Sequence, residues 1–278
     1  MTPARALRRW VVCRWYAGGA SKKNEMLIHS IAKKQHQTTM TAYIEDFTAA
    51  DLLEDYPMPS IGRCLKSSTA YIEARWNLLS DFVEEVCAGR DDSHGHAHMK
   101  AVAETTRFII QQDFIDDSGN LTLDAITAAW LHDVADHKYD HDGTLEQKLD
   151  DFGRANIWNY QEIKQVIKYV SFSTENKAII AGAPLNFQAI LGAYYSQIRD
   201  IVSDADKLEA IGSIGIHRCI EYTTHTNPTY THAQINNEVK KHADEKLLRL
   251  STQFIKTPTA RSIANIRHQE MLEWLHHH

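Results

Sequence analysis

The chain has 278 residues and a mass of 31.7 kDa, of which 43% are hydrophobic and 24% charged. These are ordinary proportions for a globular protein, and this apolar content is enough to build a sizeable core, which excludes a wholly disordered chain. The sequence contains no run of 18 or more apolar residues, so we expect no transmembrane helix and no membrane partner.

The net charge of −6 is unevenly distributed along the chain. Residues 1–44 hold eight basic side chains and one acidic side chain, a local charge of +7 that leaves −13 for the remainder. An acidic body lacks the basic surface of a nucleic-acid-binding protein, so no nucleic-acid partner is expected. The four cysteines are far apart and form no CxxC pair. This excludes a disulfide framework and a cysteine zinc site, and it favours a reducing, cytoplasmic location.

The basic N-terminal segment has three interpretations. Its richness in arginine and shortage of acids are typical of organelle transit peptides, and they also fit a disordered arm or sequence upstream of a start at Met26 or Met40. Residues 45–66 are acidic and then contain Pro57 and Pro59, which indicates a connector. We therefore expect a flexible arm and connector over 1–66 and one domain over 67–278. The terminal histidines 276–278 are either natural or a tag remnant, and they are not counted among the candidate site residues.

From residue 67 onward the sequence predicts helices in series. In the first helix, apolar residues recur at helical spacing up to Gly89, where the helix is expected to stop. The second helix covers 96–115. The third begins at Thr122 as N-cap and runs to about Tyr139. Further helices are expected at about 144–152, 159–170, 188–211, 239–254 and 258–275, the last with Thr257 as N-cap and Pro258 at its first position.

Strand signals are few, and no alternation of strands with helices is present. The predicted fold class is therefore all-α. In such folds, chemistry is built from side chains that face inward across neighbouring helices.

Histidine is the compositional outlier, because six of the 16 histidines lie within residues 94–141. Histidine is the commonest metal ligand and the usual acid or base at neutral pH. The first cluster is the run Asp92-Ser-His-Gly-His-Ala-His98 at the start of the second helix. His94 and His98 can share one helix face there, whereas His96 points elsewhere. The plainer alternative is a hydrated, histidine-rich turn.

Two further motifs carry acids inside apolar helices. In the third helix, His132 and Asp136 are four residues apart and Asp133 and Asp136 three apart, so each pair lies on one face. An imidazole beside carboxylates suits a divalent cation with mixed nitrogen and oxygen ligands. Asp204 and Asp206 interrupt a later apolar helix, and buried acids are rare unless paired or bound to metal. Solvated or salt-bridged surface faces are the alternatives for both motifs.

Taken together and in this order, the three motifs resemble the HD-domain superfamily of metal-dependent phosphohydrolases. The likeness extends to Val170-Ser-Phe-Ser173, which resembles the Ser-Phe stretch of that family. Residues 204–216, Asp-Ala-Asp-Lys-Leu-Glu-Ala-Ile-Gly-Ser-Ile-Gly-Ile, resemble the signature of its small nucleotide-hydrolysing branch. The resemblance covers about residues 68–275. It implies an HD-domain helical bundle with a metal site between core helices.

The resemblance also assigns roles to individual residues. The implied metal ligands are His98, His132, Asp133 and Asp206, with Asp204 as the rival of Asp206. Asp136 matches the acid that positions or deprotonates the attacking water, and His94 fits a supporting or phosphate-facing role. Lys138 and Lys207 are the candidate phosphate partners, and solvated lysines are the alternative reading for both. The remaining histidines of the cluster, His96, His137 and His141, are interpreted as bystanders at the rim.

Two positions depart from the family pattern. Gly95 stands where the family usually has Asp after the first His, and Ala101 stands where it usually has Arg, with Lys100 beside it. Both departures concern the orientation of substrate more than the binding of metal.

The resemblance implies hydrolysis of a phosphate ester or anhydride by a metal-activated water. The implied substrate is a nucleotide, and the first candidate is a nucleoside triphosphate that loses pyrophosphate. The ligand set favours Mn²⁺, with Co²⁺, Fe²⁺ or Mg²⁺ as alternatives. A non-catalytic nucleotide- or metal-binding sensor or scaffold remains open, as does a phosphodiesterase. The expected partner is a small phosphate substrate, and the oligomeric state is not predicted.

Overall fold

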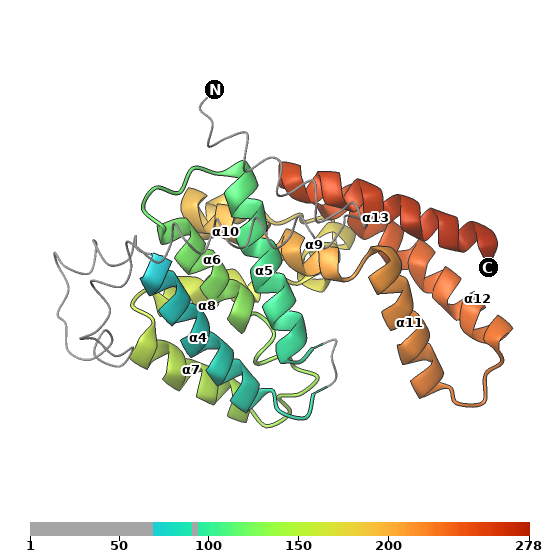
Figure 1. Ribbon diagram of the computed structural model, residues 1–278, viewed down its shortest axis with the longest axis horizontal. Helices are drawn as coiled ribbons and strands as arrows, with labels where there is room; N and C mark the ends of the chain where they lie inside the picture. Colours follow the sequence, from blue (N-terminus) through green and yellow to red (C-terminus); the bar gives the residue numbers. More distant parts are fainter. Residues whose placement is uncertain (1–68, 91–93) are drawn as a thin grey trace, which may run out of the picture. The chain divides into compact units, whose positions relative to one another are not determined.

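The computed structural model describes residues 69–90 and 94–278. The expectations for the arm and connector over 1–66 fall outside these residues and stay predictions. The described residues contain helices and no strand, which confirms the all-α class (Figure 1). The elements are α4 (Thr69–Val86), α5 (His96–Asp113), α6 (Asn120–Leu131), α7 (Thr144–Asn156), α8 (Tyr160–Lys168), α9 (Phe172–Ile180), α10 (Phe187–Glu209), α11 (Gly212–Thr226), α12 (His232–His242), the π-helical turns η1 (Ala243–Leu247) and η2 (Leu250–Phe254), and α13 (Pro258–His277).

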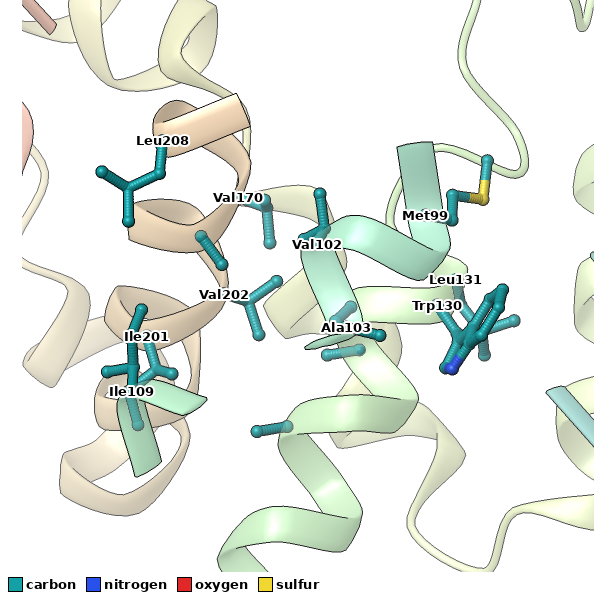
Figure 2. Close-up of a cluster of buried hydrophobic side chains, with 14 of the residues drawn as sticks. Met99, Val102, Ala103, Ile109, Trp130, Leu131, Val170, Ile201, Val202 and Leu208 are labelled. Carbon is teal, nitrogen blue, oxygen red and sulfur yellow. The ribbon is translucent and has the colours of Figure 1, made fainter. Parts of the chain in front are cut away.

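The core is built around α6, most of whose residues are buried. This helix packs against α4, α5, α8 and α10, and α5 also packs against α10. Figure 2 shows labelled side chains of this shared core, including Val102 and Ile109 from α5, Leu131 from α6, and Ile201 and Val202 from α10. Because α5, α6 and α10 carry the three sequence motifs, this packing decides whether the motifs meet.

The C-terminal helices lie together (Figure 1), with α11 against both α12 and α13. Helix α13 also contacts η2, α10 and α5, so it joins this group to the core. Its start is as predicted, because Thr257 is the N-cap and Pro258 follows at the first helical position. Among the described residues, no helix combines the length and apolarity that a membrane span needs.

The third predicted helix differs from the structure at both ends. It begins at Asn120, and Asp116 rather than Thr122 serves its exposed N–H groups: the Asp116 carboxylate accepts from the backbone N–H of Leu121 and of Thr122. It ends at Leu131, well before the predicted Tyr139. The predicted start and end were therefore both wrong.

The early end of α6 has a local cause. Beyond Leu131 the chain forms turns whose hydrogen bonds join residues three positions apart. The N–H of Val134 donates to the carbonyl of Leu131, and the N–H of Asp136 donates to that of Asp133. The Asp136 carboxylate then accepts from the N–H of Lys138 at 2.8 Å, a local bond that competes with helix. The apolar spacing misled the prediction because Val134 is fully buried although it lies outside the helix.

Two helices, α9 and α11, were not predicted, and α12 begins at His232 rather than near residue 239. Ser171 caps α9, where its hydroxyl accepts from the N–H of Ser173. The stretch matched to the family's Ser-Phe segment is therefore the start of a short helix.

Candidate metal centre

The three sequence motifs meet at one point of the core. His98 comes from the first turn of α5, His132 is the C-cap of α6, and Asp206 lies in the last turn of α10. Their ligand atoms all lie within 4.8 Å of one another. The Asp206 Oδ1 oxygen is 3.4 Å from His98 Nε2 and 3.8 Å from His132 Nε2. Residues more than 100 positions apart in sequence thus form one cluster that could hold a divalent cation.

Asp133, the fourth predicted ligand, borders this cluster. Its Oδ2 oxygen lies 3.9 Å from His98 Nε2 and 3.7 Å from His132 Nε2. The carboxylate therefore faces the same two imidazole nitrogens as Asp206 does. Two imidazoles and two carboxylates are a donor set that suits a transition metal of intermediate softness.

The orientation of the His132 ring is fixed by a backbone contact. Its Nδ1 lies 2.7 Å from the carbonyl oxygen of Ala129, and because a carbonyl only accepts, Nδ1 carries the hydrogen. This leaves Nε2 directed at the cluster. Within the described residues, the buried Nε2 of His132 has no hydrogen-bond partner. A buried polar atom in that state is costly unless a ligand satisfies it, so these residues fit a bound cation.

Electrostatic interactions within the cluster favour the charged forms of its side chains. Burial alone would lower the pKa of the His132 imidazole, but the Asp133 and Asp206 carboxylates outweigh burial and raise this pKa to about 9. Burial would likewise raise the pKa of Asp206, yet the two imidazoles hold it well below its usual range. Without a cation, His132 is therefore protonated at neutral pH. A metal ion would compete with that proton for Nε2.

We expect the metal-free protein to lose stability as the pH rises from about 6.5 to about 9. The pKa of His132 is higher in the folded chain than the value of about 6.5 in an unfolded chain, so its contribution is complete below the lower value and disappears above the upper one. The expected loss is on the order of 3 kcal/mol. Urea unfolding in EDTA at several pH values measures it, and His132→Gln should flatten the profile. An equally steep profile in that variant would contradict the assignment.

The structure separates the two acids that compete for the distal ligand position. Asp204 is fully buried and its carboxylate faces away from the cluster, towards the start of α13. It accepts from the N–H of Lys256 at 2.9 Å, and from both the N–H (2.6 Å) and the hydroxyl (2.9 Å) of Thr257. Asp204 thus anchors a helix N-terminus, while Asp206 lies in the cluster.

Two of the other predicted site residues pair with each other. The Lys138 Nζ nitrogen lies 3.1 Å from His94 Nε2, and the ring centroids of His94 and His98 are 6.5 Å apart. Lys138 is exposed and His94 half-buried, so both can meet a solute that approaches His98.

Asp136 makes local contacts. Its Oδ1 accepts from the N–H of Lys138 and lies 3.4 Å from His137 Nδ1. Among the described residues, no hydrogen bond or ion pair joins its carboxylate to the cluster. Asp136 lies in the same turn as the predicted ligand Asp133, and this shared turn is its connection to the site.

Lys207 lies in a buried charge network rather than at an open face. Its side chain is 1% exposed, its ammonium group donates to the hydroxyl of Ser203, and it lies 3.9 Å from Glu175 Oε2. Burial and the nearby Arg199 lower its pKa to about 8. Glu175 is also bound by Arg199 at 2.7 Å and by Lys256 at 2.8 Å. The structure thus places Lys207 in a buried charge network, and its role as a phosphate partner stays a prediction.

The histidines interpreted as bystanders differ in their surroundings. His137 has 90% of its side chain exposed, as expected for a bystander. His96 differs, because its Nε2 lies 2.8 Å from the Ser80 hydroxyl and its ring is 5.2 Å from that of Trp130. One residue of this region was not predicted at all: Arg90, whose guanidinium contacts the backbone of Asp133. A single arginine after a helix stop carries no recognisable signal in sequence.

The described residues are helical and bring the three sequence motifs together, and several solved structures share this fold. YpgQ, an uncharacterized protein of Bacillus subtilis (strain 168), is 27% identical over 204 residues, which cover 71% of this chain and 88% of YpgQ. A crystal structure of YpgQ in complex with ADP aligns with a TM-score of 0.52 at 21% identity, covering 74% of this chain and 94% of that one.

A solved structure from Lactobacillus plantarum aligns with a TM-score of 0.55 at 25% identity, covering 74% of this chain and 95% of that one. A structure described as an HD-superfamily hydrolase of Bacillus thuringiensis aligns with a TM-score of 0.46 at 22% identity, covering 74% and 94%. No protein-family model matches the chain.

Proposed function

We propose that this protein is a metal-dependent phosphohydrolase that cleaves a phosphate ester or anhydride of a nucleotide. One observation carries the proposal: His98, His132 and Asp206 converge within 4.8 Å, and the buried His132 Nε2 has no hydrogen-bond partner in the described part of the chain. Asp133 adds a second carboxylate beside the same nitrogens. A cation held there would lower the pKa of a water molecule and offset charge on a phosphoryl oxygen.

The protein residues around the cluster divide the remaining work. His132 is held in one tautomer by Ala129, so its Nε2 stays directed at the cluster. Asp136 is the proposed general base, since its Oδ1 is engaged by the N–H of Lys138 and its Oδ2 is the oxygen that would take a proton. The turn that carries Asp136 also carries Asp133, so both acids depend on one backbone conformation.

The proposed phosphate contacts are Lys138 and His94. Their 3.1 Å contact places an ammonium group and an imidazole side by side near His98. Both side chains offer charged or polar donors to phosphoryl oxygens. Lys138 therefore takes the role that the sequence divided between Lys138 and Lys207.

The substrate class is supported by the relative that binds ADP. YpgQ shares the fold of this chain over most of its length and has been crystallised with ADP. A nucleotide is therefore the proposed ligand here, with a nucleoside triphosphate as the first substrate to test. Mn²⁺ is the proposed metal because imidazoles favour it over Mg²⁺ and carboxylates accept it.

The test is a panel of nucleoside mono-, di- and triphosphates, cyclic nucleotides and simple phosphate esters, each assayed with Mn²⁺, Co²⁺, Mg²⁺ and EDTA. We expect turnover of at least one nucleotide with Mn²⁺, none in EDTA, and a fall to background in Asp133→Ala. Equal turnover by the variant, or none by the parent on any phosphate substrate, would count against the proposal.

The same panel tests the alternatives. Stoichiometric binding of a transition metal without hydrolysis would favour a sensor or scaffold. Cleavage confined to cyclic nucleotides would indicate a phosphodiesterase. The hydrolase is favoured by the acid at 136, which a protein that only binds a nucleotide or metal does not need.

A further inference from the structure

The guanidinium group of Arg90 lies against the turn that follows α6. Nη1 donates to the carbonyl oxygen of Asp133 at 2.9 Å, and Nη2 donates to that of Val134 at 2.6 Å. The carbon Cζ lies 4.5 Å from the centre of the Tyr139 ring, a cation–π contact. One half-buried side chain, from just after α4, thus contacts three residues of the segment 133–139.

These carbonyl groups lie in the turn after α6, which ends at Leu131, so helical N–H groups do not pair with them. Among the backbone groups of the described residues, the Asp133 carbonyl accepts from the N–H of Asp136, at 3.2 Å. Arg90 supplies a second donor to it. The positive charge of Arg90 also lies at the C-terminal end of α6, where the helix dipole is negative.

The planar guanidinium is what allows both bonds at once. Two of its N–H groups point in nearly the same direction, so they can reach two successive carbonyl oxygens, whereas the ammonium of a lysine is a single point donor. The two contacts hold the backbone at the carbonyl of Asp133 and at the carbonyl of the residue that follows it. That backbone carries the carboxylate whose Oδ2 lies 3.7 Å from His132 Nε2.

The other end of the contact reaches the proposed phosphate side. The Tyr139 ring under Arg90 lies 5.7 Å from the His94 ring, and His94 meets Lys138 at 3.1 Å. Arg90 therefore touches both ends of one short turn: the ligand residue at its beginning and the aromatic residue beside the rim at its end.

We propose that Arg90 is a positioning residue for the candidate metal centre, which rests on the proposed function. It holds the turn 133–139 in the conformation that places Asp133 at the cluster and Lys138 at the rim. It touches neither the cluster nor a substrate, and it acts through the backbone carbonyls of Asp133 and Val134.

The first measurement uses the full-length, metal-free protein and does not depend on activity. In EDTA, Arg90→Ala should speed hydrogen exchange of the amides in 133–139 by about tenfold or more relative to wild type, because the turn loses two hydrogen bonds. Exchange in α10 and α13 should stay as in wild type. Unchanged exchange in 133–139 would overturn the proposal, and so would an equal increase throughout the chain.

The second measurement is Mn²⁺ affinity by titration calorimetry. Residues that orient metal ligands change affinity by about 10–100-fold, and we expect Arg90→Ala to weaken Mn²⁺ binding within this range. Arg90→Lys should give an intermediate loss, since it restores the charge and one of the two bonds. The control is Arg107→Ala, which removes an exposed ion pair between Arg107 and Glu73 at 2.9 Å and should leave Mn²⁺ affinity unchanged.

The outcomes separate the two proposals. Wild-type Mn²⁺ affinity in Arg90→Ala would overturn the positioning role and leave the hydrolase proposal intact. Identical affinities for Arg90→Lys and Arg90→Ala would overturn the claim that the charge and the single remaining bond contribute. A wild-type protein that binds no Mn²⁺ would remove the basis of the hydrolase proposal, while hydrogen exchange would still decide whether Arg90 holds the turn.

Discussion

Asp206→Asn is expected to abolish metal binding and to reduce hydrolysis by about three orders of magnitude, equivalent to about 4 kcal/mol of transition-state stabilisation. Asp206 Oδ1 is the carboxylate oxygen nearest to the two imidazoles, at 3.4 Å from His98 Nε2 and 3.8 Å from His132 Nε2. An amide keeps the size of the side chain and removes the negative charge that a cation requires. Mn²⁺ titration and the nucleotide assay measure the two effects.

The structural consequence of Asp206→Asn should be small and specific. Asp206 is one of the two carboxylates that raise the pKa of His132, so we expect the imidazole to titrate at lower pH in the variant. NMR titration of the His132 ring in metal-free protein measures that shift. An unchanged circular dichroism spectrum would show that the helices persist. Retained Mn²⁺ affinity in Asp206→Asn would reject the cluster as the metal site.

The sequence was informative about this site because its residues break a strong local rule. Asp133 and Asp206 are acids in otherwise apolar stretches that the sequence predicts as helix, and such residues are rare inside a protein without a partner or a metal. The order of the motifs then gave the family resemblance. Which motifs meet depends on the packing of α5, α6 and α10, which no local pattern contains.

The failures have equally specific causes. Helix α11, which begins at Gly212, was not predicted. Gly215 is needed there because a Cβ atom would lie 2.1 Å from the carbonyl oxygen of Ala210, a distance that real Cβ atoms do not reach. The surroundings of Lys207 could not be predicted either: its ammonium is bound by Ser203 and lies near Glu175, partners that only the tertiary structure brings to it.

The rivalry between Asp204 and Asp206 shows the same limit. The two acids are two residues apart in one helix, and the sequence separated them only through the resemblance. The structure gives them different partners, since Asp206 faces two imidazoles while Asp204 faces the backbone at the start of α13. One short motif therefore contains both a candidate metal ligand and a helix anchor, and these two roles predict opposite mutational phenotypes.

Asp204→Ala is accordingly expected to destabilise the fold and to leave the metal cluster of the folded molecules intact. The change removes the acceptor of the N–H groups of Lys256 and Thr257 and of the Thr257 hydroxyl, in a fully buried position. Buried donors left without acceptors cost about 1–3 kcal/mol each, and removal of a buried charge offsets part of this cost. We expect a net loss of about 3 kcal/mol, or a fall in Tm of about 6–12 °C for a unit of this size.

Thermal and urea unfolding in EDTA, followed by circular dichroism, measure this loss. The matched control is Asp151→Ala, which removes an exposed acid 3.9 Å from Arg154 and should change stability by less than about 1 kcal/mol. Mn²⁺ affinity, measured below the transition temperature, should match wild type in Asp204→Ala. If Asp204→Ala instead kept wild-type stability and lost Mn²⁺ binding, the roles assigned to Asp204 and Asp206 would have to be exchanged. Removal of the residue that anchors the start of α13 must lower stability, whereas removal of a metal ligand need not.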